Sequence, residues 1–519
     1  MGSSMCRFFA VSSIFAGEAA GAWRGWSISD DGTTRARPPP WRAYTTDTLS
    51  YTGKTEVAIV GAGYAGLTAA QVLSEAGVEV AVLEARDRVG GRVYTESRGD
   101  FWIDHGGQWI GRSQLRLGEL ARRHGVETFL TYDEGDNLAF RHGNRFTYTG
   151  LIPTDQPDVT ADAVAALLDL DLMALQVPAD APWDAPEAKE WDSITAHSWF
   201  KDNIESAEAQ HELELFVEAV FSSQSRDMSL LHFLFYLKSA GGSTPLIAVA
   251  GGGQESRFVG GAQQVANRIA AQLGDRVRLN SPVLGVAYHE GGVTITGAGF
   301  EVEARRAVIA VPPPLGARIN WSPALPIARQ QIFQRVPMGC AVKVHAVYDR
   351  PFWREEGLSG QFVSQAGPVK FGFDNSPPDG NHGVLLGFME GDDARTWASA
   401  SAEDREAETI RAFTEYFGPR ASRPEAYTER SWAHEEFSRG CYAGVFGPGV
   451  WTTFGSVIRE PVQTLHWAGT ETATEWMGYI DGAVESGERA AREILVALEV
   501  PEGQRPAALP SRYTHPVEA

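Results

Sequence analysis

Residues 56–84 read EVAIVGAGYAGLTAAQVLSEAGVEVAVLE, and the fold can be read outward from this stretch. The segment Glu56–Val60 is apolar and β-branched after its first residue, and it leads directly into Gly61-Ala-Gly63-Tyr-Ala-Gly66. Leu67–Ala76 then predicts a helix, and Val78–Leu83 predicts a second apolar strand. A strand, a tight glycine turn, a helix and a strand in this order are typical of a dinucleotide-binding βαβ unit.

Each glycine of the turn has a physical reason. Gly61 permits the turn, Gly63 lets the backbone approach a pyrophosphate, and Gly66 lets the helix pack against the strand. The amino end of the helix then faces the phosphates. Glu84 lies 18 residues beyond Gly66, where a carboxylate accepts hydrogen bonds from the ribose hydroxyls. A purely structural turn is the alternative, but the flanking strands and the acid favour a dinucleotide.

The next residues favour FAD over NAD. The stretch Glu84-Ala85-Arg86-Asp-Arg-Val-Gly-Gly91-Arg92 adds two glycines and three arginines, and Phe101–Gly111 adds Gly106-Gly107-Gln108-Trp109. NAD dehydrogenases have no such continuation. We expect the arginines to neutralise the pyrophosphate and the glycines to bring backbone close to the flavin end. A solvated basic loop is the alternative interpretation.

The composition indicates a large globular enzyme. The chain has 519 residues, 43% of them hydrophobic, with 15 Trp and 25 Phe, which suffices for two or three domains. Acidic residues outnumber basic ones 66 to 45, a net charge of −21 that repels nucleic acid and anionic membranes and mildly favours cationic ligands. We therefore expect no nucleic-acid partner.

Cysteine content and apolar segments bear on the compartment. Three cysteines, Cys6, Cys340 and Cys441, make no disulfide framework and fit a reducing compartment. The longest apolar stretch, Met228–Ala240, is too short for a membrane span and predicts a core helix. Residues 1–50 are expected to be a disordered extension and residues 498–519 a polar tail. The chain is thus expected to be soluble and cytoplasmic, without an integral membrane anchor.

A family resemblance becomes specific near the carboxyl end. The decisive pieces are Ser438-Arg-Gly-Cys441-Tyr442 and residues 469–492, GTETATEWMGYIDGAVESGERAAR. On these motifs, the chain from about residue 54 to 498 resembles the flavin-containing amine oxidase family, and the monoamine oxidases in particular. The resemblance implies FAD, and it places Cys441 where monoamine oxidases form a thioether with the flavin ring. A buried, inert thiol with noncovalent FAD is the alternative.

The resemblance also implies the catalytic residues. Tyr442 and Tyr479 match two tyrosines whose rings flank the substrate in front of the flavin. Lys343, in an otherwise apolar strand, matches a lysine that reaches flavin N5 through a water and assists reoxidation by dioxygen. Without the family pattern, the tyrosines would be read as core aromatics and Lys343 as an edge-strand lysine with its head in solvent.

The remaining implied contacts form two groups. The cofactor-binding group comprises Gly61, Gly63, Gly66, Glu84, Ala85, Arg86, Gly91, Arg92, Gly107, Gln108, Val283, Trp432, Cys441, Gly469, Glu471 and Ile480. The substrate pocket comprises Trp109, Ile247, Gln254, Phe371 and Phe388. Since most pocket residues are apolar, we expect arylalkyl or alkyl amines rather than charged diamines. Departures from the family, namely Ala219, Val220, Lys370, Glu475 and Met477, leave the substrate open.

The fold that follows is α/β. A Rossmann-like FAD-binding domain is expected from the discontinuous residues 54–129, 259–332 and 435–497, with Val277–Val283 and Ala307–Val311 as strands. Residues 130–258 and 333–434 are expected to form a substrate-binding domain of mixed sheet and helices.

The reaction implied by the resemblance is oxidative deamination of a primary or secondary amine. A hydride equivalent passes from carbon to flavin, water hydrolyses the imine to an aldehyde and ammonia, and dioxygen reoxidises the flavin with release of hydrogen peroxide. No metal site is predicted, and His232 and His345 are expected to be satisfied core or surface residues. Three alternative functions stay open: an L-amino-acid oxidase, a polyamine oxidase and a flavin-binding protein without turnover. The chain could also form a homodimer.

Overall fold

The computed structural model describes residues 26–28, 34–36 and 51–512. The chain divides into two units, residues 1–48 and residues 49–519. In the first unit the described residues form two antiparallel strands, β1 (Trp26–Ile28) and β2 (Thr34–Ala36). The disorder predicted for the rest of residues 1–50 concerns residues outside the described ones.

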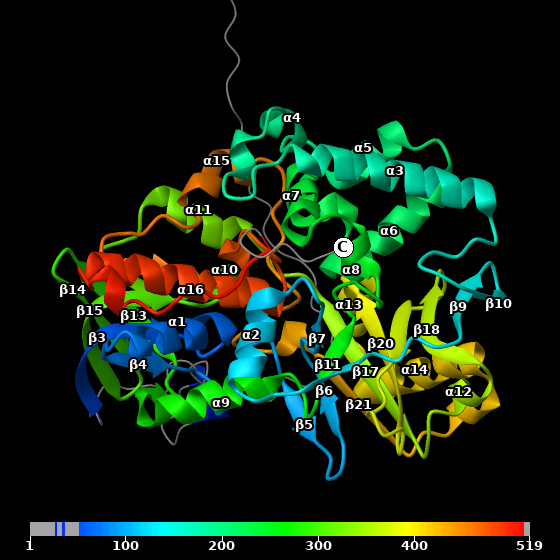
Figure 1. Cartoon of the computed structure of the whole chain (residues 1–519), viewed down its shortest axis with the longest axis horizontal. Coiled ribbons are helices and arrows are strands. Elements are labelled where there is room, and N and C mark those ends of the chain that lie inside the picture. The colour runs from blue at the N-terminus through cyan, green and yellow to red at the C-terminus, as the bar shows by residue number, and fades with distance from the viewer. Residues whose placement is uncertain (1–25, 29–33, 37–50, 513–519) are drawn as a thin grey trace, which may run out of the picture. The chain divides into compact units, whose positions relative to one another are not determined.

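An eight-stranded sheet lies at the centre of one half of the second unit (Figure 1). Its order is β12-β4-β3-β15-β14-β13-β16, with β22 also paired to β15. The strands are β3 (Tyr51–Val60), β4 (Val80–Leu83), β12 (Val277–Arg278), β13 (Val283–His289), β14 (Gly292–Gly297), β15 (Phe300–Ile309), β16 (Asn320–Ser322) and β22 (Leu465–Trp467). β12, β4, β3, β15 and β22 run parallel, and the last four residues of β3 and all of β4 are buried, as expected for strands covered on both faces.

Three helices pack on this parallel part. α1 (Tyr64–Glu75) follows the glycine turn and lies beside α16 (Ile480–Ala497), and α9 (Gln263–Leu273) also contacts α1 (Figure 1). α16 begins more than 400 residues after α1 in the chain, so the Rossmann-like half is completed by a segment from near the carboxyl end.

The predicted strands and helices are mostly confirmed, with one correction. α1 begins at Tyr64 rather than Leu67, and β15 covers most of the predicted strand Ala307–Val311. The strand predicted from Val277 to Val283 was wrong, since β12 ends at Arg278 and β13 begins at Val283. Pro282 cannot donate to a ladder and Asn280 has a positive φ of 52°, so the chain turns there. The backbone amides of Asn280 and Ser281 donate to the carbonyl oxygens of Arg86 and Glu84.

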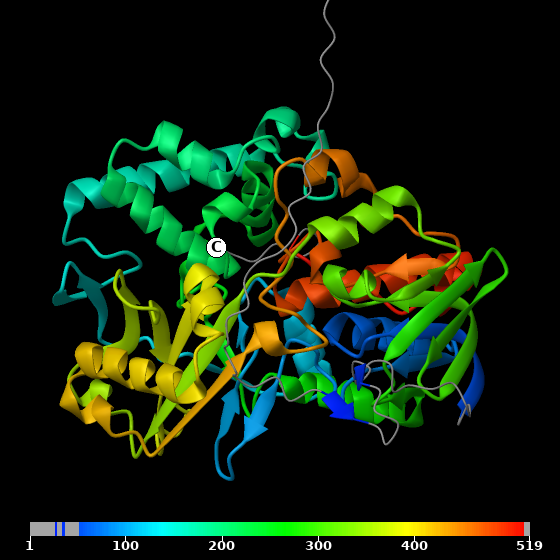
Figure 2. The same ribbon diagram turned by 180° about the vertical axis from the view of Figure 1, so that it is seen from behind.

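A seven-stranded mixed sheet forms the other half, in the order β10-β9-β18-β19-β20-β17-β21. β9 and β18 are parallel and the other pairs antiparallel. The strands are β9 (Asp136–Arg141), β10 (Asn144–Tyr148), β17 (Ala341–Tyr348), β18 (Leu358–Ser364), β19 (Phe371–Asp374), β20 (Gly383–Glu390) and β21 (Ala426–Ser431). α14 (Ala402–Phe417) covers one face of this sheet (Figure 2), where Phe413 and Phe417 join its apolar core.

Helices lie above the mixed sheet in Figure 1. They are α3 (Pro157–Leu175), α4 (Ala188–Trp191), α5 (Ala196–Asn203), α6 (Ala207–Phe221), α7 (Leu230–Ala240) and α8 (Thr244–Ile247). α7 confirms the core helix predicted at Met228–Ala240, and Ser229 caps it by accepting from the amide of His232. In the part of the chain that the structure describes, no helix has the length and apolar character needed to cross a membrane.

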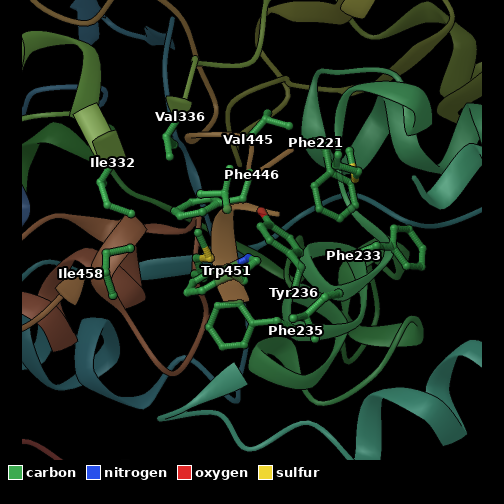
Figure 3. Packing of buried hydrophobic residues seen from close by; sticks show 14 of the residues in the cluster. Phe221, Phe233, Phe235, Tyr236, Ile332, Val336, Val445, Phe446, Trp451 and Ile458 are labelled. Carbon is green, nitrogen blue, oxygen red and sulfur yellow. The ribbon is translucent and has the colours of Figure 1, made fainter. Parts of the chain in front are cut away.

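An aromatic cluster joins these helices to the carboxyl-terminal segment (Figure 3). Phe446 stacks on Trp451 with ring centroids 4.4 Å apart, and Trp451 meets Phe235 of α7 edge-on at 5.0 Å. Phe221 of α6 lies 4.4 Å from Tyr236. The cluster therefore fixes α6 and α7 beside residues that follow the Cys441-Tyr442 motif.

The remaining elements connect the two halves. β7 (Trp109–Ile110), β11 (Ser256–Phe258) and β8 (Thr128–Leu130) form a three-stranded sheet, and β5 (Thr95–Ser97) pairs with β6 (Trp102–Asp104). The other helices are α2 (Leu115–Arg123), α10 (Pro313–Gly316), α11 (Ile327–Arg335), α12 (Phe352–Glu355), α13 (Gly391–Trp397) and α15 (Val450–Phe454). The predicted fold class, a Rossmann-like sheet built from discontinuous segments beside a mixed sheet with helices, is confirmed. The exact domain boundaries stay a prediction.

Candidate active site

The glycine turn has the shape that its sequence predicts. Gly61 has a φ of +101°, and a Cβ on it would lie 2.7 Å from the carbonyl oxygen of Ala310. A Cβ on Gly66 would overlap the carbonyl oxygen of Gly61, so only glycine lets α1 pack this closely against the turn. Glycine is therefore required at both positions by the protein's own backbone packing, whether or not a ligand is bound.

Gly63 and the second glycine pair behave differently. A Cβ on Gly63 would meet only the Cα of Gly91, at 3.9 Å. The amide of Gly90 donates to the carbonyl oxygen of Ala62, which folds the second pair onto the first. Since no side chain crowds Gly63, the open backbone there fits a group that must approach closely, as a pyrophosphate does.

Glu84 lies at the end of β4, where only 4% of it is exposed. Its carboxylate accepts from the amides of Ala62 (2.7 Å) and Arg86 (3.0 Å). A carboxylate can accept about four hydrogen bonds, so lone pairs stay free for ribose hydroxyls. Ala85 follows directly, and Val283 begins β13 after the loop whose amide at Ser281 donates to Glu84.

Arg86 and Arg92 both contact carboxylates from the carboxyl-terminal part of the chain. Arg92 forms a two-point ion pair with Glu471 (2.6 and 3.1 Å) and also donates to the carbonyl oxygen of Tyr442 (2.8 Å). Arg86 donates to Ser438 (2.8 Å) and lies 3.4 Å from a carboxylate oxygen of Glu435. Both arginines are thus paired with carboxylates and join the residue 86–92 loop to the Cys441 segment. Their expected part in neutralising a pyrophosphate stays a prediction.

The carboxyl-terminal cofactor candidates lie near the glycine-rich loop. A Cβ on Gly107 would lie 3.2 Å from Cδ1 of Ile480, so these two residues are neighbours. Gly469 donates its amide to Ser486 of α16, and Glu471 accepts the amide of Gly444 in addition to Arg92. Ile480 and Glu471 are thereby held next to segments more than 350 residues earlier in the chain.

Lys343 is buried, with 3% of it exposed. Its Nζ donates to the carbonyl oxygen of Gly106 (2.9 Å) and to Oε1 of Gln108 (2.6 Å). The ammonium also lies 5.5 Å from the ring centroid of Trp109 and 5.6 Å from that of Phe388. Burial lowers the pKa of Lys343 to about 7, with the buried carboxylate of Asp104 acting in the opposite direction. The alternative of an edge-strand lysine in solvent is therefore wrong.

One of the two histidines departs from expectation. His232 accepts a hydrogen bond from Trp451 (3.2 Å) and is a satisfied core residue, as predicted. His345 has no exposed surface, and neither ring nitrogen has a hydrogen-bond partner among the described residues. Burial, together with the positive charge of Lys343, holds the pKa of His345 well below its usual value. The expectation that the ring nitrogens of His345 have hydrogen-bond partners was thus wrong. His345 lies in β17, a strand whose residues are buried on both faces, so its ring does not reach the surface.

Cys441 is buried in a small cluster with Ala341 and Trp432, against which Tyr94 and Tyr442 pack. Trp432 donates its indole N–H to the carbonyl oxygen of His105 (2.8 Å), which places it one residue from Gly106. Burial raises the pKa of the Cys441 thiol, while Arg92 and Lys343 act to lower it. The thiol is free, as is that of the buried Cys340.

The two tyrosines occupy different surroundings. The hydroxyl of Tyr442 donates to the buried carboxyl of Glu390, and its ring meets Phe388 edge-on, with centroids 6.2 Å apart. The ring of Tyr479 packs against Trp476 (4.8 Å) and lies 6.2 Å from Tyr236. The structure thus brings Tyr442 to the Lys343 side of the site and Tyr479 to the helical side. That their rings face one another stays a prediction.

The predicted pocket residues form two groups. Trp109 lies 6.3 Å from Phe388, and Phe388 pairs with Phe371 across β19 and β20, so these three share one region. Gln254 donates to the carbonyl oxygen of Leu246, which precedes Ile247 at the end of α8. Lys370 is no free cation beside Phe371, because it is paired with Glu218 and Asp393 at 2.8 Å each.

Two buried acids were missed from the sequence. Asp104 is fully buried and accepts from the hydroxyl of Thr95 and the amide of Ala262. Glu390 ends the buried strand β20. A charged residue in an apolar strand was the signal that singled out Lys343, and the same signal would have found Glu390. Among the described residues, no group of three or more His, Cys, Asp or Glu side chains is arranged to hold a metal ion.

Comparison with known proteins decides the family. Residues 64–495 match the family model described as flavin containing amine oxidoreductase, which covers far more than half of the chain. The chain belongs to the flavin-containing amine oxidoreductase family. Its members contain a flavin and oxidise amines with dioxygen, so FAD, an amine and dioxygen are the cofactor and substrates of this enzyme family.

Relatives within the family are similar over most of their length. Human amine oxidase [flavin-containing] B is 38% identical over 458 residues, which are 87% of this chain and 88% of the relative. "Probable flavin-containing monoamine oxidase A" of Dictyostelium discoideum is 36% identical over 442 residues, 85% of this chain and 97% of its own.

Solved structures of amine oxidases have the same fold as this chain. Putrescine oxidase bound to putrescine superposes with a TM-score of 0.83 at 36% identity, covering 86% of this chain and all of that chain. Cyclohexylamine oxidase from Brevibacterium oxydans gives a TM-score of 0.82 at 34% identity, over 86% and 99% of the two chains. The open backbone at Gly63 and the free lone pairs of Glu84 fit the dinucleotide part of the flavin that the family uses.

Proposed function

We propose that this protein catalyses oxidative deamination of a primary amine to an aldehyde, with ammonia and hydrogen peroxide as the other products. Amine, dioxygen and water are consumed in equal amounts, since water supplies the aldehyde oxygen. When bound, FAD would supply the two-electron redox chemistry that links oxidation of the amine to reduction of dioxygen. A monoamine is the substrate class we favour within the family.

The observation that supports this proposal most directly is the buried ammonium of Lys343 against two aromatic rings. Trp109 and Phe388 approach it on one side, and Tyr442 stands edge-on to Phe388. With a pKa of about 7, Lys343 can take up or release a proton near neutral pH at a place closed to bulk water. An apolar aromatic wall excludes water and admits an uncharged amine.

The other residues of the site hold the Lys343 side chain, the FAD and the amine in place and do not themselves react. Gln108 and the carbonyl oxygen of Gly106 hold the Lys343 ammonium, and Gln108 itself donates to Asn375 (2.8 Å). Glu84 and Gly63 are assigned to the adenosine and pyrophosphate parts of FAD. Tyr442 and Tyr479 are assigned to the two sides of the amine, where they orient its α-carbon.

We further propose that FAD is joined covalently through Sγ of Cys441. The thiol lies in one cluster with Trp432 and directly precedes Tyr442, so a flavin seated against these residues would come close to it. Burial, Cys340 and Glu390 raise the pKa of this thiol, whereas the positive charges of Arg92 and Lys343 act to lower it and favour the thiolate that the linkage needs.

The substrate assignment favours arylalkyl amines. The pocket candidates Trp109, Phe371 and Phe388 present rings, and the cation at Lys370 is neutralised by two carboxylates. A second ammonium on the substrate would lose its hydration against these rings, and the rings themselves offer no carboxylate to pair with it.

A peroxide assay of the FAD-loaded protein tests the proposal. Benzylamine, tyramine, putrescine and an L-amino acid are supplied separately, and hydrogen peroxide is measured with a peroxidase-coupled dye. We expect release with benzylamine or tyramine and little with putrescine. Release with putrescine alone would overturn the monoamine assignment, release with the amino acid alone would indicate a carboxylate site, and no release with any of the four would contradict amine oxidation.

A further inference from the structure

Glu390 is a buried acid that the proposed reaction does not use. It ends β20, where it pairs with Ala341 of β17, and it lies on the same face of the strand as Phe388, two residues earlier. Only 3% of it is exposed. The carboxyl group therefore lies beside the Lys343, Phe388 and Tyr442 side chains, at the inner edge of the aromatic wall.

Its two oxygens differ in what they contact. Oε1 accepts hydrogen bonds from the hydroxyl of Tyr442 and from that of Ser222 (3.2 Å). Oε2 is buried and has no hydrogen-bond partner among the residues that the structure describes. A buried acid held by two hydroxyls rather than by a cation is costly to keep, which calls for a reason beyond packing.

The charges nearby do not supply a partner cation for Glu390. Glu218 of α6 lies close enough to raise its pKa further, beyond the effect of burial. Lys370, whose charge acts to lower the pKa of Glu390, is itself bound to Glu218 and Asp393 at 2.8 Å each. Burial and the charge of Glu218 therefore both raise the pKa of the Glu390 carboxyl, and its contact with Tyr442 is a hydrogen bond rather than an ion pair.

Tyr442 is held at both ends. Arg92, itself paired with Glu471, donates to its carbonyl oxygen at 2.8 Å, and Glu390 accepts from its hydroxyl. Between these points the ring touches only the edge of Phe388 among its aromatic neighbours. Ser222, which donates to Glu390, is a further polar neighbour of the Tyr442 hydroxyl, so the small cluster built around the Glu390 carboxyl selects one ring orientation over another staggered one.

We propose that Glu390 is a positioning residue for amine oxidation, because its hydrogen bond to the Tyr442 hydroxyl sets the orientation of one wall of the amine site. The inference rests on the proposed function in that the wall is the one assigned to the substrate. Glu390 acts through Tyr442 and does not itself contact the reacting atoms. A misplacement of about 1 Å in such a wall lowers turnover by about a hundredfold.

A double-mutant cycle tests the proposal. The variants are Glu390→Leu, Tyr442→Phe and both together, assayed for kcat and KM with whichever of benzylamine and tyramine the wild type oxidises faster. We expect each single change to lower kcat/KM by about ten- to a hundredfold and the double change to lower it no further. Independent losses that multiply in the double variant, or a Glu390→Leu variant with wild-type kcat/KM, would overturn the inference.

Two further variants separate positioning from general damage. Glu390→Gln keeps a side-chain oxygen that can accept from the Tyr442 hydroxyl and has the same shape, so it should retain most of the kcat/KM that Glu390→Leu loses. Asp393→Asn changes the charge of the same cluster without touching Tyr442 and should leave kcat/KM within about twofold of wild type. Thermal unfolding and the flavin content of each purified variant show whether it has folded.

A readout without turnover distinguishes failure of this inference from failure of the proposed function. With 3-fluorotyrosine incorporated, the ¹⁹F resonance of Tyr442 is identified as the one missing from Tyr442→Phe. We expect Glu390→Leu to shift or broaden that resonance and Glu390→Gln to leave it near its wild-type position. An unmoved resonance in Glu390→Leu would sink the inference even if the enzyme is active, and a moved one would support it even if none of the amines is oxidised.

Discussion

Nζ of Lys343 lies 2.6 Å from Oε1 of Gln108, a neutral acceptor, in a region closed to solvent. The two residues are 235 positions apart, and β17 and the Gly106–Gln108 loop bring them together. Because the ammonium gains hydrogen bonds but no direct ion pair, its burial is incompletely compensated, and the pKa falls to about 7 from the ordinary lysine value of 10.5.

The lowered pKa of Lys343 predicts a pH-dependent effect of Lys343→Met on stability. Below pH 7 both the folded and unfolded states carry the proton, so the cost of burying the charge is fully present. Between pH 7 and 10.5 the unfolded state binds the proton and the folded state does not, so the cost disappears as pH rises. We expect the variant's Tm relative to wild type to be highest at pH 6 and to fall toward pH 10. A difference that grows with pH would contradict the assignment.

The same variant should lose turnover. If Lys343 exchanges a proton near the flavin, Lys343→Met should lower kcat about a hundredfold or more, within the range typical of general acid–base residues. Stopped-flow reoxidation of the reduced enzyme by dioxygen is the measurement. Wild-type reoxidation rates in a folded, flavin-loaded variant would remove Lys343 from the reaction.

Gly63 and Gly66 are expected to respond differently to alanine. Gly66→Ala places a Cβ on the carbonyl oxygen of Gly61, so we expect it to lower the Tm of the protein even without flavin. Gly63→Ala has room and an ordinary φ of −71°, so the flavin-free protein should unfold as wild type while its affinity for FAD falls. Calorimetry of flavin-free protein and FAD titration are the measurements. Unchanged FAD affinity in Gly63→Ala would mean that the pyrophosphate lies elsewhere.

Cys441→Ser tests the flavin linkage. After acid precipitation we expect the yellow colour to remain with the wild-type pellet and to pass into the supernatant for Cys441→Ser, because serine cannot form the thioether. Cys340→Ser removes the other buried thiol of the described residues and should behave as wild type. Yellow supernatant from the wild type would show that the flavin is bound noncovalently.

His345→Leu is expected to stabilise the protein or leave its stability unchanged. Leucine has a similar volume and removes two buried nitrogens without partners, each of which costs about 1–3 kcal/mol when unsatisfied. His232→Leu is the matched control, since it strands the indole N–H of Trp451 and should lower the Tm. A marked fall in Tm for His345→Leu would show that its nitrogens have partners, such as buried water.

Local sequence sufficed for the first βαβ unit. Val57–Val60 and Val80–Leu83 are buried on both faces, and continuous apolar runs of this kind predict parallel strands. The glycine turn was predictable because backbone geometry at Gly61 and Gly66 is a property of the local chain. The break after Arg278 had one local signal, Pro282, but its position is also fixed by hydrogen bonds from Asn280 and Ser281 to residues almost 200 positions earlier, which the sequence does not show.

The candidate site divides in the same way. The sequence alone singled out Lys343, because a lysine in an otherwise apolar strand is expected to be buried and a buried charge is costly without a partner. The hydrogen-bond acceptors of Lys343, Gly106 and Gln108, and the burial that lowers its pKa could be seen only in the tertiary structure. The ion pairs of Arg86 with Glu435 and of Arg92 with Glu471 could not be predicted, because a sequence shows a charge but not the carboxylate that lies beside it in the fold.

The sequence by itself therefore determined the α/β class, the dinucleotide turn and the residue types of the site, since these depend on periodicity, glycine geometry and motif. Only the tertiary structure decided that Glu390 holds the hydroxyl of Tyr442, that Glu471 neutralises Arg92 and that His345 has no hydrogen-bond partner among the described residues. Hydrogen bonds and burial are relations between residues far apart in the chain, and their energies exist only once the chain has folded.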